Sequence, residues 1–310
     1  MRPRNEGPGG GVDAPAATAG GYAAARKGAH HDRRVSGAPD RGDDPSRPMA
    51  TDLIDDRLLA SLHLRTMSRR GFAHDPAAEH VAFQAGTLDA LMKGAFDGDA
   101  TVGEVLAHGD LGIGTVEHLG GEMIVLDGAA YLADGDGHVR PVDHATRTPF
   151  AVVCRFTPRL VAELADVRGL TALTDEVSSR SEPRYSITAV RIDGEFGQLR
   201  LRSVHAQQPP YVALAEVTRH QREWTVARAR GSLVGFRFPD RMAGVEVPGY
   251  HFHFLSDDRT TGGHVLELSV RRGTLAVDGA DELHLEIPAG VELGTPGAAD
   301  RAAIRAVEGG

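Results

Sequence analysis

Three histidines late in the chain have a spacing that could bind a metal ion. His251 and His253 alternate with the aromatic residues Tyr250, Phe252 and Phe254. In a β-strand successive side chains point to opposite faces, so both imidazoles would lie on one face and the aromatic rings on the other. Imidazole nitrogen is a common protein ligand of zinc and of other divalent transition metals.

A third histidine, His264, follows the polar stretch 256–263, which ends in two glycines. If the two flanking strands form a hairpin centred near residues 258 and 259, His264 lies opposite His253, with Cβ atoms about 5 Å apart. Three neutral imidazoles leave a divalent ion its full charge and open positions, which is typical of a catalytic metal site. The spacing therefore predicts a metal centre on this hairpin. Zinc is the first expectation, and iron, nickel, copper and cobalt are also compatible with imidazole ligands.

The strands that would position these histidines belong to a region rich in strand patterns. Asp-Gly pairs at 127–128, 134–135 and 136–137 are typical of turns between paired strands. Apolar runs, alternating or continuous, predict strands at 114–119, 122–126, 150–156, 185–192, 197–204, 233–238, 250–255, 264–271 and 283–287.

Three stretches have helical patterns. Residues 87–96 form a short apolar-periodic segment with a threonine cap, and Thr101 and Glu104 have the spacing of a capping box. A further helical region is expected to begin at residue 160 and to continue toward 177. These elements predict an α/β protein that is β-rich and α+β-like, with two sheet-based lobes. We expect the histidine hairpin in the C-terminal lobe, facing the cleft between the lobes.

The composition changes along the chain and suggests its domains. The first 48 residues include nine glycines and six prolines and almost no bulky apolar side chains, so they could not form a core. We expect a disordered extension over 1–75, an N-terminal lobe over 76–182, and a C-terminal lobe with a terminal tail over 183–310. A Met-Ala pair at 49–50 marks a second possible start of translation.

The charge and the cysteine content exclude several classes of protein. A net charge of −9 argues against nucleic acid or an anionic membrane surface as the main partner. Apolar runs reach about five residues, far below the roughly 20 that a membrane-spanning helix needs. Cys154 is the single cysteine, so no internal disulfide can form, and we expect a cytoplasmic protein with a small-molecule substrate.

Several blocks of the sequence resemble the alpha-acetolactate decarboxylase family and follow in that family's order. The resemblance covers roughly residues 83–308. Its one noted departure is Leu111, where family members usually have an aromatic residue. The blocks are Leu91–Gly98, Gly109–Thr115, Leu119–Glu122, Ala189–Gly194, Gly249–Phe254, Gly262–His264 and Val307–Gly309.

The resemblance implies an activity, a cofactor and a set of site residues. The activity is the conversion of 2-acetolactate to acetoin and CO2, a step of acetoin and butanediol biosynthesis, by a homodimer of two-lobed subunits. The implied zinc ligands are His251, His253 and His264. The other implied site residues are Thr115, Glu122, Arg202 and Glu308.

The chemistry of this reaction is compatible with those side chains. The substrate carboxylate needs an oriented cationic partner, and the planar guanidinium of Arg202, on the polar face of a predicted strand, suits it. A proton must then reach the carbon that lost CO2, which needs a positioned acid. Glu122 and Glu308 are the candidates for that proton donor and for an acid or base near the metal. Thr115 could hold the substrate through a hydrogen bond.

Two other functions use similar residues. A cupin-like oxygenase or isomerase also carries His-x-His on a strand, but it would have a glutamate a few residues later and a distant third histidine. This chain has Asp257 and Asp258 there, and its third histidine follows after only ten residues. A non-enzymatic metal-binding or small-ligand-binding protein would need a filled coordination shell, whereas three neutral ligands leave positions open.

Overall fold

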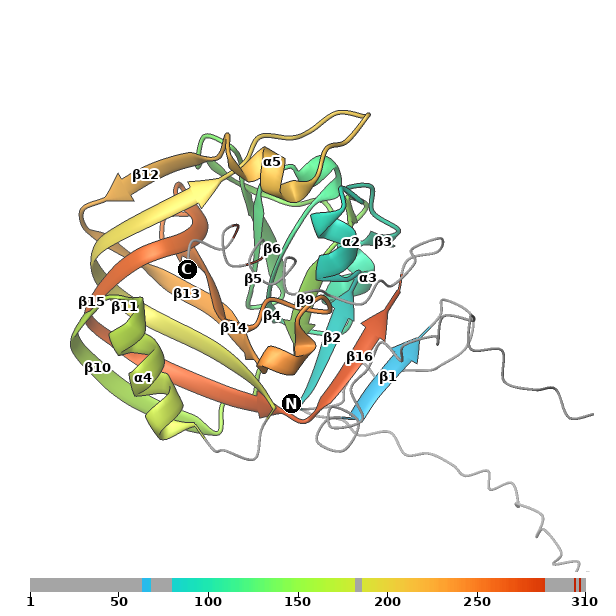
Figure 1. Cartoon of the computed structure of the whole chain (residues 1–310). Helices are drawn as coiled ribbons and strands as arrows, with labels where there is room; N and C mark the ends of the chain where they lie inside the picture. Colours follow the sequence, from blue (N-terminus) through green and yellow to red (C-terminus); the bar gives the residue numbers. More distant parts are fainter. Residues whose placement is uncertain (1–62, 68–79, 182–185, 288–303, 305–306, 308–310) are drawn as a thin grey trace, which may run out of the picture. The chain divides into compact units, whose positions relative to one another are not determined.

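The structure, a computed structural model, describes residues 63–67, 80–181, 186–287, 304 and 307 (Figure 1). Within the expected extension over 1–75, residues His63–Met67 form strand β1, and the rest of that stretch lies outside the described residues. Among the residues described, no helix has both the length and the apolar content to cross a bilayer.

The larger of the two main sheets has eight strands in the order β1-β16-β2-β9-β4-β5-β6-β7. β1, β16 and β2 pair in parallel, and the remaining neighbours are antiparallel. Its strands, in chain order, are β1 (His63–Met67), β2 (Val81–Ala85), β4 (Leu111–Thr115), β5 (Glu122–Leu126), β6 (Ala129–Ala133), β7 (Val139–Pro141), β9 (Ala151–Cys154) and β16 (Glu282–Glu286).

The second sheet has six strands in the order β10-β15-β14-β13-β11-β12, and an additional pairing of β15 with β11 closes four of them into a barrel. This closure is possible because β11 and β15 are long enough, at 17 and 19 residues, to pair with different neighbours along their length. The strands are β10 (Leu160–Arg168), β11 (Ile187–Ser203), β12 (Arg222–Val226), β13 (Ala229–Phe238), β14 (Gly249–Ser256) and β15 (Gly262–Ala280).

Short elements connect the sheets. A two-stranded pair, β3 with β8, lies beside the larger sheet. The connecting elements are β3 (Ala100–Thr101), β8 (Arg147–Thr148), the α-helices α2 (Leu88–Met92), α3 (Val102–Leu106), α4 (Leu170–Arg180) and α5 (Leu214–Thr218), and the 3-10 helices η1 (Glu117–Leu119) and η2 (Asp240–Met242).

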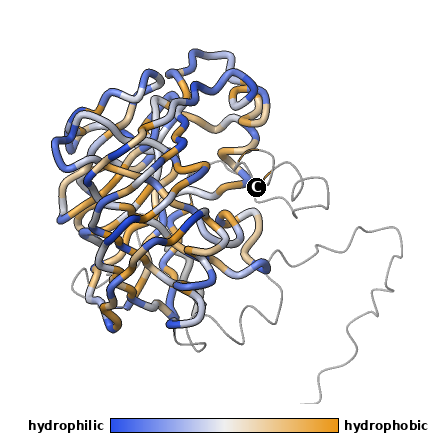
Figure 2. Tube along the Cα trace, turned by 90° about the vertical axis from the view of Figure 1, so that its left-hand side faces the viewer, coloured by the Kyte–Doolittle hydropathy of each residue, from blue (hydrophilic) through white to orange (hydrophobic). Residues whose placement is uncertain are grey.

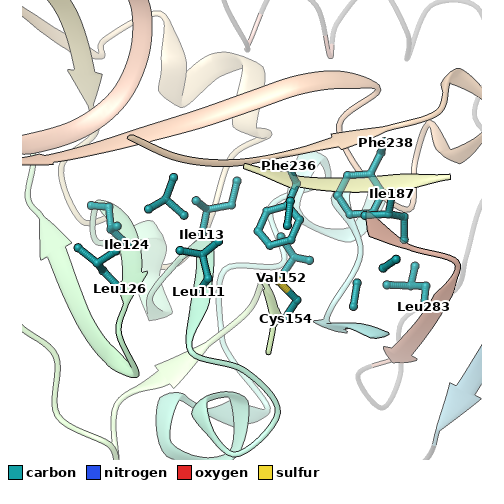
Figure 3. Close-up of a cluster of buried hydrophobic side chains, with 14 of the residues drawn as sticks. Leu111, Ile113, Ile124, Leu126, Val152, Cys154, Ile187, Phe236, Phe238 and Leu283 are labelled. Atoms are coloured by element: carbon teal, nitrogen blue, oxygen red, sulfur yellow. The ribbon is translucent and has the colours of Figure 1, made fainter. Parts of the chain in front are cut away.

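The two sheets pack face to face across a shared apolar core. Ile113, Ile124 and Cys154 of the larger sheet meet Phe236 and Phe238 of the second sheet in one buried cluster (Figure 3). Leu111, which departs from the family pattern, packs in the same cluster and is 1% exposed. This layer between the sheets, which we call the intersheet core, buries one face of each.

The opposite faces are also covered, which explains the continuous apolar runs. Along β5, Ile124 faces the intersheet core while Met123 and Val125 belong to a separate cluster with α3. Along β14, Phe252 and Phe254 belong to a different cluster, which also includes Leu173 and Val177 of α4. In segments with one exposed face, by contrast, hydrophobic and hydrophilic residues alternate, and both kinds occur along the trace (Figure 2).

Both short helices are confirmed with their caps. The Thr87 hydroxyl accepts from the Ala90 amide at the start of α2. Thr101 and Glu104 form the reciprocal bonds of a capping box at α3. The Asp-Gly pair at 127–128 joins β5 to β6, with both residues at positive φ, as a tight hairpin requires.

The helix expected from residue 160 is wrong at its beginning. Leu160 and Leu164 have the i, i+4 spacing of a helix, but the same residues also lie on one face of a strand. The chain there forms β10, which pairs with β15, and only after Gly169, at a φ of 86°, does α4 begin. Pairing with a distant strand therefore overrides an ambiguous local pattern.

Other expected boundaries shift. The strand expected over 114–119 is β4, which ends at Thr115, and the chain then turns through η1. The two strands expected over 185–192 and 197–204 are the single strand β11, with register shifts between Glu195 and Gln198. The lobes were expected to divide between residues 182 and 183. β10 lies before this point and belongs to the second sheet, whereas β16 lies after it and belongs to the larger sheet.

The single cysteine offers a chemical test of the intersheet core. Cys154 is 3% exposed, and burial raises the pKa of its thiol well above the usual range. Because the thiolate is the reactive form, we expect a thiol reagent to label the native protein at least about 100-fold more slowly than the unfolded protein. Labelling kinetics with and without guanidinium measure this ratio.

A matched control replaces the buried thiol by an exposed one. The double variant Cys154→Ala, Ser179→Cys carries its thiol on the exposed end of α4 and should react rapidly in the native state. Equally rapid labelling of native Cys154 would contradict its position in the core.

Candidate metal centre

β14 and β15 form the hairpin that the histidine spacing predicted. His253 lies directly opposite His264, and Phe254 opposite Gly263. The turn is held by Asp258, whose carboxylate accepts hydrogen bonds from the hydroxyls of Ser256 and Thr260. These bonds lower the pKa of Asp258 and keep it charged as a turn-stabilising acceptor.

The three imidazoles converge on one point. His251 Nε2 lies 3.1 Å from His253 Nε2 and 3.0 Å from His264 Nδ1. Two nitrogens each about 2.1 Å from one ion, at tetrahedral or octahedral angles, are roughly 3.0–3.4 Å apart. All three side chains are at most 9% exposed. The three nitrogens could therefore hold one metal ion.

The protonation of the histidines suits this role. His253 Nδ1 lies 2.9 Å from the Met123 carbonyl oxygen, which can only accept, so Nδ1 donates and Nε2 offers its lone pair to the cluster. Burial lowers the pKa of His253 to about 4 despite this bond, and the Arg202 charge adds to the effect. Burial also lowers the pKa of His251 well below its usual range. Both imidazoles are therefore neutral near pH 7, the form that binds metal.

A carboxylate and a guanidinium border the histidine cluster. Glu122 Oε2 lies 3.3 Å from His253 Nε2, and Glu122 Oε1 lies 3.8 Å from Arg202 Nη1. Glu122 begins β5 of the larger sheet, whereas Arg202 lies on β11 next to His264 in the barrel. The charged groups of this site therefore come from both sheets.

Thr115 lies opposite Glu122 where β4 pairs with β5. Its side chain is buried, and its hydroxyl donates to the Gly121 carbonyl oxygen over 2.7 Å. Gly121 has a φ of 136°, and a Cβ at this position would lie 2.3 Å from the Ala133 carbonyl oxygen, so only glycine fits. The hydroxyl of Thr115 thus holds the turn that leads into Glu122.

Periodicity explains why these side chains meet. Glu122 lies two residues before Ile124 on β5, and Thr115 two residues after Ile113 on β4, so each points to the same face of its strand as that isoleucine. Both isoleucines face the intersheet core. On β14, His253 has the same parity as Leu255, which faces the same core from the other sheet. The site is therefore the polar continuation of the intersheet core.

The polar groups line one side of a pocket whose remaining wall is apolar. Thr115, Glu122, Arg202 and the three histidines form the polar side, with Gly114, Gly121 and Thr218 also lining the pocket. The apolar wall consists of Leu88, Leu91, Leu119, Phe150, Val204, Leu214, Val247 and Val307.

Sequence reasoning did not identify most of the apolar wall. Leu214 and Thr218 come from α5, a helix that was not expected, although their i, i+4 spacing is a helical signal. Val307 lines the pocket from the C-terminal segment. Glu308, the next residue and a candidate site residue, lies outside the described residues.

A second group of possible ligands, Asp134, Asp136 and His138, lies on the β6–β7 turn. Asp134 Oδ1 accepts from the backbone amides of Asp136 and His138, which is the bonding of an aspartate-stabilised turn. Asp136 and His138 are exposed. This group therefore serves as the turn that its Asp-Gly pairs predicted.

The chain has clear relatives. A family model described as alpha-acetolactate decarboxylase matches residues 82–294. The alpha-acetolactate decarboxylase of Methylococcus capsulatus is 39% identical over 237 residues, covering 76% of this chain and 90% of that protein. The alpha-acetolactate decarboxylase of Brevibacillus brevis is 36% identical over 221 residues, covering 71% and 78%.

A solved structure is similar as well. The crystal structure of alpha-acetolactate decarboxylase from Bacillus subtilis strain 168 superposes with a TM-score of 0.71 at 31% identity, covering 74% of this chain and 100% of that one. These matches confirm the family resemblance that the sequence blocks predicted.

The convergence of the imidazoles predicts the effect of removing one. His253→Ala should bind divalent metal at least about 10-fold more weakly than wild type, because two imidazoles remain where three converged. Metal content after dialysis and a zinc or cobalt titration would measure the loss. His144→Ala, at an exposed histidine outside the pocket, is the control and should bind like wild type. Undiminished binding by the His253 variant would exclude this histidine as a ligand.

Proposed function

The chain belongs to the alpha-acetolactate decarboxylase family, and from this premise we propose that it decarboxylates 2-acetolactate to acetoin and CO2 at a metal ion held by His251, His253 and His264. The observation that carries the proposal is the convergence of three imidazole nitrogens beside a carboxylate and a guanidinium in one pocket. Bound there, a divalent ion would supply Lewis acidity to the neighbouring substrate oxygens.

Arg202 is the proposed partner of the substrate carboxylate. Its side chain is 4% exposed and lines the pocket, so its charge is little screened by water. A guanidinium can hold a carboxylate by two parallel hydrogen bonds, which orients the carbon–carbon bond that breaks. As CO2 leaves, the electron pair of that bond passes to the carbon conjugated with the ketone.

Glu122 is the proposed proton donor to that carbon. It lies on β5 of the larger sheet, whereas the histidines lie on the barrel strands β14 and β15. A donor fixed on a different sheet from the metal ligands can approach the substrate from one side only. Glu308 is the second proposed acid or base, supported by the position of Val307, its neighbour in the chain, in the pocket wall.

The apolar wall is proposed to contact the two methyl groups of the substrate. Leucine and valine side chains make up most of this wall. A substrate seated against them would displace water from around the reacting carbon. Exclusion of water strengthens the interaction of Arg202 with the carboxylate. Thr115, whose hydroxyl proton is directed at Gly121, keeps its oxygen lone pairs for a hydrogen bond from the substrate hydroxyl.

Finer parts of the proposal rest on the family. We propose zinc as the bound ion, a cytoplasmic homodimer as the working form, and a role in acetoin and butanediol synthesis. The two sheets correspond in this proposal to the two lobes of the catalytic unit, with the site between them.

The activity can be tested directly. Purified full-length protein with racemic 2-acetolactate should release acetoin and CO2 in equal amounts. Glu122→Gln should lower kcat by about 100-fold or more while retaining metal, because a positioned proton donor typically accelerates a reaction by at least this factor. Glu163→Gln, at an exposed site on β10, is the matched control and should retain full activity. A metal-loaded wild type that forms no acetoin would refute the function.

The role of Glu308 needs its own variant. Glu308→Gln should lower kcat by at least about 10-fold at unchanged metal content, because it removes one acid or base while keeping the side-chain volume. Glu292→Gln, in the same C-terminal segment, is the control. Equal turnover of the two variants would remove Glu308 from the proposed site.

A further inference from the structure

Resting on the proposed function, we propose that Thr148 is a positioning residue for the reaction, which sets the carboxyl group of Glu122 through two successive hydrogen bonds. Thr148 lies on β8, outside the pocket, and is 1% exposed. Its hydroxyl begins a path of donors and carbonyl acceptors that ends at the peptide before Glu122.

The first bond joins Thr148 to β4. The Thr148 hydroxyl lies 2.7 Å from the Thr115 carbonyl oxygen and 3.1 Å from the Phe150 carbonyl oxygen. A hydroxyl has one proton, and the shorter contact is the better place for it. The Phe150 carbonyl already accepts from the Thr115 amide over 2.9 Å, whereas Thr148 bonds the carbonyl of Thr115 itself. Thr148 therefore holds the end of β4 where Thr115 projects into the site.

The second bond joins Thr115 to the turn. The Thr115 hydroxyl donates to the Gly121 carbonyl oxygen over 2.7 Å. That carbonyl belongs to the rigid peptide plane that continues into the amide of Glu122, so its direction sets the Cα of Glu122. The Ala133 carbonyl oxygen crowds Gly121 from the other side. Gly121 is thus held between a donor on β4 and a neighbour on β6.

The turn has local reasons to need this support. Its residues His118 and Leu119 have φ values of 63° and 52°, a left-handed conformation that is unfavourable for side chains of this kind. Such a conformation persists only when the surrounding structure holds it. The Thr148 hydroxyl bonds the residue before this turn, and the Thr115 hydroxyl bonds Gly121 at its end, immediately before the proposed proton donor.

Small displacements of the Glu122 carboxylate would disturb the site. Its carboxylate is 3.3 Å from His253 Nε2 and 3.8 Å from Arg202, so a shift of about 1 Å would change both contacts. A displacement of that size at a reacting group can lower a rate by about 100-fold. Loss of the Thr148 hydroxyl should therefore affect turnover more than substrate binding or metal binding.

The test compares valine and serine at this position. Thr148→Val keeps the volume and removes the donor, whereas Thr148→Ser keeps the donor. Thr188→Val removes the hydroxyl of another buried threonine, on β11 and outside the pocket, and is the matched control. For each protein, kcat, KM, metal content, melting temperature and hydrogen exchange of a peptide spanning residues 116–122 are measured.

We expect Thr148→Val to lower kcat by about 10- to 100-fold, with KM within about threefold of wild type and full metal content. Amide exchange over 116–122 should be faster than in wild type. Thr148→Ser should restore kcat and exchange to within about threefold, and Thr188→Val should match wild type. If Thr148→Val does not fold, Thr148→Cys, a weaker donor of similar size, should show the same pattern to a smaller degree.

Several results would overturn the proposal. They are wild-type kcat in the valine variant, an equal loss in the serine or Thr188 variants, loss of metal, or unchanged exchange over 116–122. Wild type is measured beside each variant, so absence of acetoin from metal-loaded wild type would refute the proposed function separately. The exchange measurement would still decide whether Thr148 holds the turn.

Discussion

The pairing of His253 with His264 across the β14–β15 hairpin is the contact on which the site depends. Two imidazoles lie directly opposite each other, and His251 lies two residues away on the same face. A single hairpin therefore brings the three nitrogens to one point. The barrel makes this point buried, because β15 also pairs with β11 and brings Arg202 beside His264. Burial in turn keeps His251 and His253 neutral and available to a metal ion.

The second requirement is a sheet that faces the barrel. The same side-chain parity that directs Ile124 and Ile113 into the intersheet core directs Glu122 and Thr115 toward the histidines. The pocket is therefore the place where an apolar layer between two sheets becomes polar, and its leucine and valine wall continues the packing around it. This arrangement combines a largely apolar pocket wall with a few fixed charges, which is what stabilisation of a charged transition state needs.

Local patterns predicted much of this correctly. The caps of α2 and α3, the Asp-Gly hairpin after β5 and the opposition of His253 to His264 all follow from residues close together in sequence. The region from Leu160 was misread as helical because its apolar spacing fits both a helix and a strand, and only pairing with β15 decides between them. No local sequence pattern indicates a role for Thr148, because its partner Thr115 lies 33 residues away.

By itself, the sequence determined the family, the three histidines and the hairpin that holds them, because strand periodicity and turn chemistry act over a few residues. It also named Glu122, Arg202 and Thr115, but only through the resemblance. Tertiary structure alone decided that Glu122 meets His253 and Arg202, that α5 supplies part of the pocket wall, and that Thr115 holds Gly121. Most of these contacts join different sheets or distant segments, and the Thr115–Gly121 bond depends on how β4 and β5 pair. No local pattern encodes which buried faces will pack together.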